Sequence, residues 1–164
     1  MSLCGVRSLV VAAGVVVALP AAAGAQGRAW PSFMVTRYAD GQSVASATLA
    51  GSDSRVVLIV RPRCEPCRHV LARLSRDAHR TGPGRKFVVL SGFEAAEAAA
   101  LRTLASGLPP TAWYLDPTGS AATALGVQST PALIGLRGDR IAWVLGGSLY
   151  TDAQWEGVVL PWLR

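Results

Sequence analysis

The sequence predicts an α/β domain in which a central mixed sheet is flanked by helices. Two short apolar runs, residues 55–61 and 86–90, are rich in β-branched side chains, and each is followed by a segment with helical character. A third run, residues 112–115, precedes a short helix and two strand-like segments that a turn joins. Strands and helices that alternate in this order favour a sheet covered by helices on both faces.

The segment before the first buried strand predicts a β-hairpin. Residues 33–38 (FMVTRY) alternate in the manner of an edge strand. Ala39, Asp40 and Gly41 form a turn signal, and residues 43–49 can pair back against the first strand. We therefore expect an N-terminal β-hairpin extension of the sheet.

The first buried strand leads directly into an amphipathic helix. Residues 55–61 (RVVLIVR) form a continuous apolar run between two arginines, which is typical of a strand buried on both faces. Pro66 suits the first turn of a helix, because the N–H that proline lacks has no partner there. Apolar side chains then recur at helical spacing along one stripe. The stripe consists of Cys67, Val70, Leu71, Leu74 and Ala78.

The second half of the chain is predicted to complete the sheet. Residues 86–90 (KFVVL) form a second buried strand, and the alanine-rich helix after it places Glu94 and Glu97 near its positive N-terminal end. The later elements are expected at residues 94–105 (helix), 112–115 (strand), 120–125 (helix), 132–136 and 141–145 (hairpin) and 152–163 (helix). We expect Trp155 and Trp162, in the last helix, to pack in the core.

The first residues have the pattern of an export signal. A positively charged start is followed by an uncharged, largely apolar run at residues 8–19, which Pro20 ends. Ala23, Gly24 and Ala25 then provide the small residues that a signal peptidase accepts.

This pattern divides the chain into a signal peptide at residues 1–25, a short tether at residues 26–32 and one domain at residues 33–164. The alternative to cleavage is an anchor, because the uncharged residues 8–25 reach the lower limit of a bilayer-spanning helix. In either case we expect the domain to lie outside the cytoplasm, periplasmic or secreted. It would then meet the membrane only through an uncleaved N-terminal segment.

The charge pattern argues against nucleic acid as a partner. The chain carries 16 lysine and arginine residues against 10 aspartate and glutamate residues, a formal net charge of +6. The basic residues are scattered and do not alternate with aromatic residues or glycine in the manner of a nucleic-acid-binding motif.

Two cysteines carry the predicted chemistry. Cys4 belongs to the leader, so the domain retains Cys64 and Cys67, which Glu65 and Pro66 separate. A thiolate at the N-terminus of a helix faces unpaired N–H groups and the positive end of the helix dipole, which lower its pKa. We expect Cys64, at the helix tip, to be the catalytic nucleophile and Cys67, shielded by the first turn, to be the resolving thiol.

Charged residues surround this pair in the sequence. Arg61, Arg63 and Arg68 would favour the thiolate, whereas Glu65 would oppose it. We expect the cations and the helix end to prevail.

Two other interpretations of the cysteines compete with a redox role. A zinc site needs two further ligands, and the domain offers only His69, on the polar side of the helix, and His79, more than two turns further along. We therefore expect no metal. An inert structural disulfide remains an alternative, because exported proteins can keep such a bridge.

Two segments resemble the thioredoxin superfamily. Residues 55–68 (RVVLIVRPRCEPCR) are similar to its strand–CxxC–helix unit, and residues 114–136 (YLDPTGSAATALGVQSTPALIGL) are similar to its second half, where Thr-Pro precedes a β-hairpin. The resemblance implies a thioredoxin fold in which the Thr130–Pro131 bond is cis and faces the cysteines. It also implies that Thr130 and Pro131 bind the substrate.

The export signal, the leading hairpin and the Glu65–Pro66 dipeptide are most similar to the TlpA/ResA-like branch of extracytoplasmic thiol–disulfide oxidoreductases. This resemblance implies disulfide exchange with protein substrates, in cytochrome c maturation or envelope redox homeostasis. A membrane electron donor or acceptor would be a further partner, and no cofactor would be needed. The alternative is a non-catalytic binding or assembly module of the same fold, with an inert disulfide.

Three positions depart from the pattern of this superfamily. Arg63 stands where tryptophan usually precedes the first cysteine. Leu58 and Val70 replace acidic residues that help to move protons from the resolving thiol. These departures bear on the rate and redox direction of exchange rather than on the fold.

Overall fold

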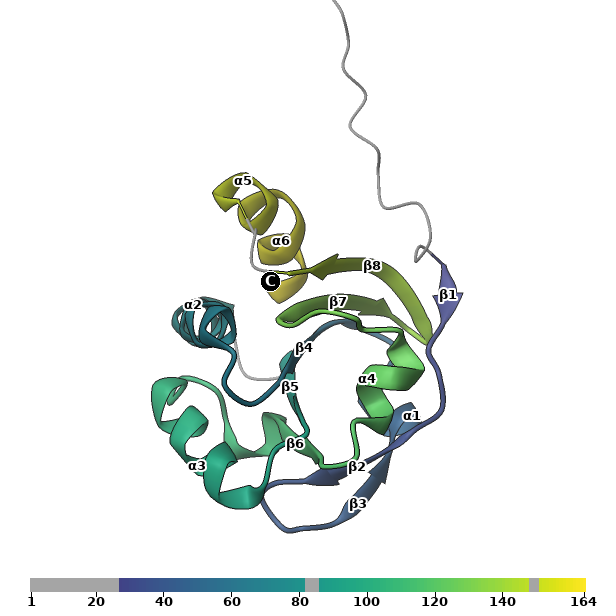
Figure 1. Cartoon of the computed structure of the whole chain (residues 1–164). Coiled ribbons are helices and arrows are strands. Elements are labelled where there is room, and N and C mark those ends of the chain that lie inside the picture. The colour runs from purple at the N-terminus through teal and green to yellow at the C-terminus, as the bar shows by residue number, and fades with distance from the viewer. Residues whose placement is uncertain (1–26, 82–85, 148–150) are drawn as a thin grey trace, which may run out of the picture.

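The computed structural model describes residues 27–81, 86–147 and 151–164. They form an eight-stranded mixed sheet in the order β1-β8-β7-β4-β5-β6-β2-β3 (Figure 1). The strands are β1 (Arg28–Ala29), β2 (Met34–Arg37), β3 (Ser43–Ala45), β4 (Ser54–Val60), β5 (Lys86–Ser91), β6 (Trp113–Asp116), β7 (Ala132–Arg137) and β8 (Arg140–Gly146). Strands β4, β5 and β6 are mutually parallel, and the other neighbouring pairs are antiparallel.

Helices cover both faces of the sheet, which confirms the predicted fold class (Figure 1). One face carries α2 (Glu65–Thr81), α3 (Ala95–Leu104), α5 (Asp152–Gln154), the π-helical segment η2 (Trp155–Val159) and α6 (Leu160–Leu163). The other face carries α1 (Ser46–Leu49) and α4 (Ser120–Leu125). A 3₁₀ turn, η1 (Pro110–Ala112), leads into β6.

Strand β4 lies between two hydrophobic clusters, as its continuous apolar run predicts. Val56, Leu58 and Val60 pack on the face that carries α2 and α3. Val57 and Ile59 pack on the face that carries α4. All five side chains are fully buried, because successive residues of a strand point to opposite faces and both faces are covered.

The predicted N-terminal hairpin is present as β2 and β3, which pair antiparallel. The backbone N–H of Gln42 donates to Asp40 (3.1 Å) in the turn and, with Arg37, holds the pKa of that carboxyl below its usual value. The return strand is shorter than the expected residues 43–49, because the chain turns into α1 at Ser46. The Ser46 hydroxyl accepts from the N–H of Phe33 (3.1 Å), which ties this turn to the preceding segment.

The expected tether, residues 26–32, contributes to the sheet. Arg28 and Ala29 form β1, which pairs with β8, and the Arg28 guanidinium donates to the carbonyl of Leu125 (2.7 Å). A strand at the edge of a sheet leaves backbone N–H and C=O groups unpaired on its outer side. Here β1 pairs with part of the outer side of β8. The signal peptide expected at residues 1–25 lies outside the described residues. Within the part of the chain that the structure describes, no helix has the length and apolar character needed to cross a membrane.

The C-terminal segment is helical, as expected, but it changes geometry at its centre. Thr151 and Gln154 form a capping box at its start. From Trp155 to Val159 the helix widens, and the N–H of Leu160 donates to the carbonyl of Trp155. Pro161 explains this change, because proline has no N–H and its ring collides with the carbonyl four residues earlier in an α-helix.

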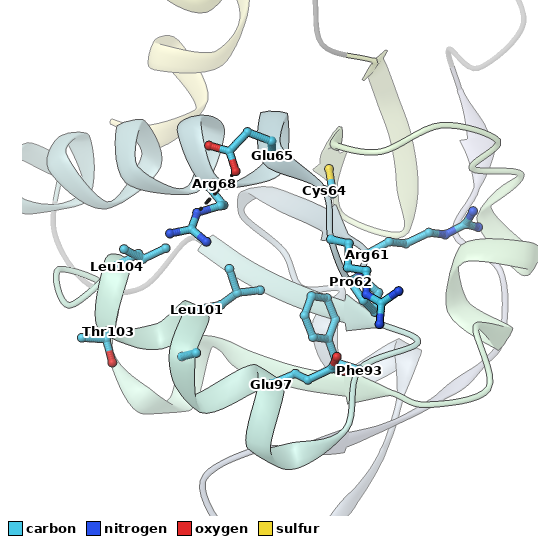
Figure 2. Close-up of a pocket in the computed structure, with 12 residues that line it drawn as sticks. Arg61, Pro62, Cys64, Glu65, Arg68, Phe93, Glu97, Leu101, Thr103 and Leu104 are labelled. Atoms are coloured by element: carbon cyan, nitrogen blue, oxygen red, sulfur yellow. Dashed lines mark ion pairs between the residues drawn. The ribbon is translucent and has the colours of Figure 1, made fainter.

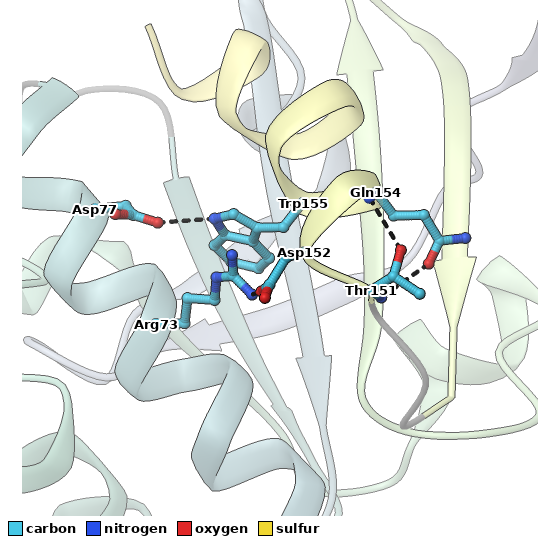
Figure 3. Close-up of polar contacts among 6 residues, drawn as sticks. All are labelled: Arg73, Asp77, Thr151, Asp152, Gln154 and Trp155. Carbon is cyan, nitrogen blue, oxygen red and sulfur yellow. Dashed lines mark hydrogen bonds and ion pairs between the residues drawn. The ribbon is translucent and has the colours of Figure 1, made fainter.

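Trp155 fixes the C-terminal segment to α2 (Figure 3). Its indole is 1% exposed, and its N–H donates to Asp77 (2.8 Å). The guanidinium of Arg73 lies 4.7 Å from the centre of the indole ring and also binds Asp152 (2.6 Å). Trp162 is partly buried against the same core, so both tryptophans pack as predicted.

Gly135 in β7 leaves room for the side chain of Trp143, so we predict that a larger residue there destabilises the protein. A Cβ atom there would overlap the indole of Trp143, which itself packs edge-to-face on Trp162 with 5.6 Å between ring centres. We expect Gly135→Ala to lower the free energy of unfolding by about 1–3 kcal/mol, as overpacking of a core does. Denaturant unfolding would measure this change.

Gly157→Ala is the matched control, because a Cβ at Gly157 meets nothing within 4 Å. It should leave stability unchanged or raise it by up to about 1 kcal/mol, since alanine restricts the unfolded chain. Equal stability of the Gly135→Ala protein and the parent would contradict the steric argument.

Candidate active site

The two cysteines lie where β4 passes into α2. Arg63, just before Cys64, has a φ of 57°, which is the left-handed conformation that non-glycine residues rarely adopt. This residue turns the chain out of the strand, and Pro66 lies in the first turn of α2, as predicted. Cys64 and Cys67 form a disulfide with 5.2 Å between their Cα atoms.

The two sulfurs have different environments. Cys67 is 2% exposed and belongs to the core under α2, whereas Cys64 is only partly buried. The backbone N–H of Cys67 donates to the Sγ of Cys64 (3.2 Å) and also approaches the carbonyl of Cys64 (3.1 Å). A donor of the first helical turn therefore points at the outer sulfur, where it can stabilise negative charge.

Three arginines line a groove together with Cys64. Arg61, Arg63 and Arg68 are all exposed. Glu65 lies 3.7 Å from both Arg68 and His69, and all three of these side chains are solvent-exposed. In the described residues no group of three His, Cys, Asp or Glu side chains is arranged to hold a metal ion.

The Thr130–Pro131 bond is cis, which confirms the expectation from the resemblance. Ala132 of β7 pairs with Ile59 of β4, and the two strands are antiparallel. Continuing this register by one residue places Pro131 beside Val60, at the edge of the sheet from which the cysteine segment emerges. The carbonyl of Pro131 accepts from the N–H of Gly147 (3.0 Å). The substrate-binding role of Thr130 and Pro131 stays a prediction.

Two of the positions where the resemblance leads us to expect an acid lie in the same hydrophobic cluster as Cys67. Leu58 is fully buried and Val70 is 8% exposed, and both belong to the same hydrophobic cluster as Cys67. Both side chains are therefore apolar members of this core. A proton that leaves or joins Cys67 must therefore reach solvent without a carboxylate at either position.

A groove of about 460 Å³ opens beside Cys64, between the start of α2 and α3 (Figure 2). Its walls are Arg61, Pro62, Arg63, Cys64, Glu65, Arg68, Phe93, Glu97, Ala100, Leu101, Thr103 and Leu104. Sequence reasoning identified the arginines but missed the residues around α3. Phe93 follows the end of β5 as Cys64 follows the end of β4, and the C-terminal ends of adjacent parallel strands form a common binding edge. That rule could have identified Phe93 from the sequence.

No protein-family model and no curated protein sequence matches this chain. Solved structures do match. A secreted disulfide oxidoreductase from Mycobacterium tuberculosis, homologous to E. coli DsbE, has a TM-score of 0.63 at 15% identity, with 80% of this chain and 93% of that chain covered. The thioredoxin domain of a thiol-disulfide oxidoreductase from Bacteroides vulgatus has a TM-score of 0.64 at 15% identity, with 82% and 96% covered.

A thio-disulfide isomerase from Thermus thermophilus has a TM-score of 0.62 at 19% identity, with 82% of this chain and 95% of that chain covered. The chain has the thioredoxin fold. Within that fold, the disulfide lies at the N-terminus of α2, and the cis proline precedes β7, at the same edge of the sheet.

The different surroundings of the two sulfurs predict that the two thiols of the reduced protein titrate differently. In the reduced protein we expect the pKa of Cys64 to lie below the value of about 8.5 for a free cysteine, because the N–H of Cys67 and nearby arginines stabilise its thiolate. Cys64 should therefore react with iodoacetamide at a pH where free cysteine is protonated, while buried Cys67 should stay unmodified. Rates measured against pH in a Cys4→Ser background would show this.

The Cys64→Ser variant is the control, since it leaves Cys67 as the remaining thiol of that background. A Cys64 that titrates at or above the free value would contradict the stabilisation by the helix end.

Proposed function

We propose that this protein is an exported thiol–disulfide oxidoreductase that exchanges disulfides with protein substrates through Cys64 and Cys67. The observation that supports the proposal most strongly is the asymmetric disulfide at the start of α2. One sulfur is accessible and faces a helix N–H, and the other is buried behind it. Exchange needs this arrangement, because one thiolate must attack a partner and the second must resolve the product.

The proposed reaction has two steps. In the reduced protein, the Cys64 thiolate attacks a substrate disulfide, a mixed disulfide forms, and one substrate sulfur leaves as a thiolate. Cys67 loses its proton and attacks the Sγ of Cys64, which restores the disulfide seen here and releases the second substrate sulfur. Two electrons pass from the cysteine pair to the substrate. The reverse sequence oxidises a substrate dithiol.

The cysteine pair itself carries the electrons, so the proposed reaction requires no metal or organic cofactor. Thr130 and the buried Pro131 are proposed to hold the substrate, since their segment reaches the edge of the sheet beside the cysteine loop. An extended substrate is proposed to align its backbone with this segment, as in β-strand addition.

We place this activity outside the cytoplasm. The signal-like residues 1–25 and the secreted mycobacterial oxidoreductase of the same fold support that location. Repeated turnover then needs a second redox partner, and a membrane electron donor or acceptor is the proposed one. Reduction of envelope proteins, apocytochromes c among them, is the form of the reaction that the TlpA/ResA-like resemblance favours.

A second candidate function is a binding or assembly module with an inert disulfide. It is favoured by Leu58 and Val70, which leave no carboxylate at either position to accept the proton of Cys67. The two candidates differ in whether the disulfide turns over.

Catalysed reduction of insulin by dithiothreitol would separate the two candidates. We expect the full chain to accelerate this reaction and the Cys64→Ser variant to be inactive, because the accessible nucleophile is lost. Cys67→Ser should accumulate mixed disulfides with insulin chains that excess reductant releases, since the second step is blocked. Non-reducing electrophoresis and mass spectrometry would identify them.

The double variant Cys64→Ser, Cys67→Ser is the control for non-specific thiol chemistry. If the parent does not accelerate the reaction and neither single variant traps a chain, the inert module is the better account.

A further inference from the structure

We propose that the groove beside Cys64 selects protein segments in which the reacting cysteine is flanked by a large apolar side chain and by acidic residues. This inference rests on the proposed function and specifies its substrate class. The groove opens next to the accessible sulfur, so a segment that reacts with Cys64 would place its neighbouring residues there.

One side of the groove is apolar. Figure 2 shows Phe93, Leu101 and Leu104 along the side of α3. Phe93 is 4% exposed and forms a fixed wall, whereas Leu104 is 41% exposed and one of only two strongly exposed large hydrophobic residues in the described chain. An apolar side chain seated here would remove Leu104 from water, and the burial of apolar surface stabilises the complex.

The opposite side carries an excess of positive charge. Arg61, Arg63 and Arg68 line it, and among the described residues no ion pair joins Arg61 or Arg63 to a carboxylate. Two acids also line the groove. The Glu65 carboxylate lies 3.7 Å from Nε of Arg68 and 3.7 Å from Nε2 of His69.

The second acid, Glu97, belongs to the α3 side, where its Oε2 accepts from the backbone N–H of Glu94 (3.4 Å). The arginines on the cysteine side therefore have unused capacity for carboxylates, and charge complementarity directs acidic residues of the substrate to them. The apolar side chain of the substrate falls toward α3. A substrate that binds both sides of the groove therefore carries a large apolar residue, such as leucine, and acidic residues next to its reacting cysteine.

Position in the fold links this selection to the reaction. Arg63 immediately precedes Cys64, and its left-handed backbone sets where the side chain leaves the loop. Many members of the superfamily have an uncharged tryptophan at this place. A cation there attracts a substrate carboxylate at the same time as it favours the thiolate, so binding and attack depend on one residue.

The test measures the first step alone. In a full-length Cys4→Ser, Cys67→Ser protein, reduced Cys64 attacks short peptides whose single cysteine is joined by a disulfide to thionitrobenzoate. The bond between the peptide sulfur and thionitrobenzoate breaks, the mixed disulfide with Cys64 forms, and the released thionitrobenzoate is followed by its absorbance. The probes carry leucine beside the cysteine and two nearby glutamates, or lysines or serines in their place.

We expect the glutamate–leucine peptide to react about tenfold faster than its lysine counterpart at low salt, within the range that electrostatic steering reaches. The difference should largely disappear at about 1 M salt, where charges are screened beyond about 3 Å. A repulsion between the Cys64 thiolate and an acidic peptide would give the opposite order. Replacing leucine by serine in the peptide should slow the reaction severalfold.

Two variants divide the groove into its parts. Arg63→Glu should reverse the order of the glutamate and lysine peptides, and this ratio is independent of the thiolate's own reactivity. Leu104→Ser should remove the advantage of the leucine peptide over the serine peptide. Arg76→Glu is the matched control, because it makes the same charge change at an exposed position more than two turns along α2 and should leave both ratios unchanged.

The disulfide of 2-mercaptoethanol with thionitrobenzoate is a probe without a peptide. It distinguishes failure of the selection by the groove from failure of the proposed oxidoreductase function. If it and all peptides react at one rate, the groove does not select, and the oxidoreductase function stands. If neither it nor any peptide reacts, both proposals fail. A glutathione probe that reacts as fast as the glutamate–leucine peptide would overturn the apolar part, because a small anionic thiol would then suffice.

Discussion

Residues 56–60 of β4 are fully buried, and they divide the interior into the two clusters on either face of the sheet. A strand buried on both faces must lie in the centre of its sheet and must be covered by helices on both sides. The positions of α2, α3 and α4 follow from this requirement. The position of the candidate active site follows as well. Both faces of β4 are covered, so the chain reaches the surface only where the strand ends.

The end of β4 also explains why the two cysteines differ. Arg63 turns the chain, Pro66 begins α2, and the apolar stripe of that helix faces the same cluster as Leu58 and Val60. Cys67 therefore enters the core with the stripe, while Cys64 remains at the tip, where the N–H of Cys67 meets its sulfur. The chemical asymmetry that the proposed reaction needs is a consequence of how an amphipathic helix starts on a covered sheet.

The structure brings three separate segments to the edge of the sheet at the end of β4. Parallel pairing of β4 with β5 places Phe93 near the cysteine loop, and antiparallel pairing of β4 with β7 brings Pro131 to the same edge. The first contributes the apolar wall of the groove, and the second is proposed to hold the substrate. Arg63 also lines the groove there, next to Cys64 in the chain, whereas Cys67 belongs to an apolar cluster.

The fold class, the cysteine pair and the order of the main elements could be predicted from the sequence, because they depend on local periodicity and on residues close together in the chain. Three other features depend on contacts between segments that are far apart in the chain. Residues 28–29 join the sheet because β8 offers unpaired backbone groups, and the last helix widens over Trp155–Val159 ahead of Pro161. The groove combines Arg63 with Leu104, which lie on different elements. Such contacts depend on strand register and helix packing, and one-dimensional patterns do not contain them.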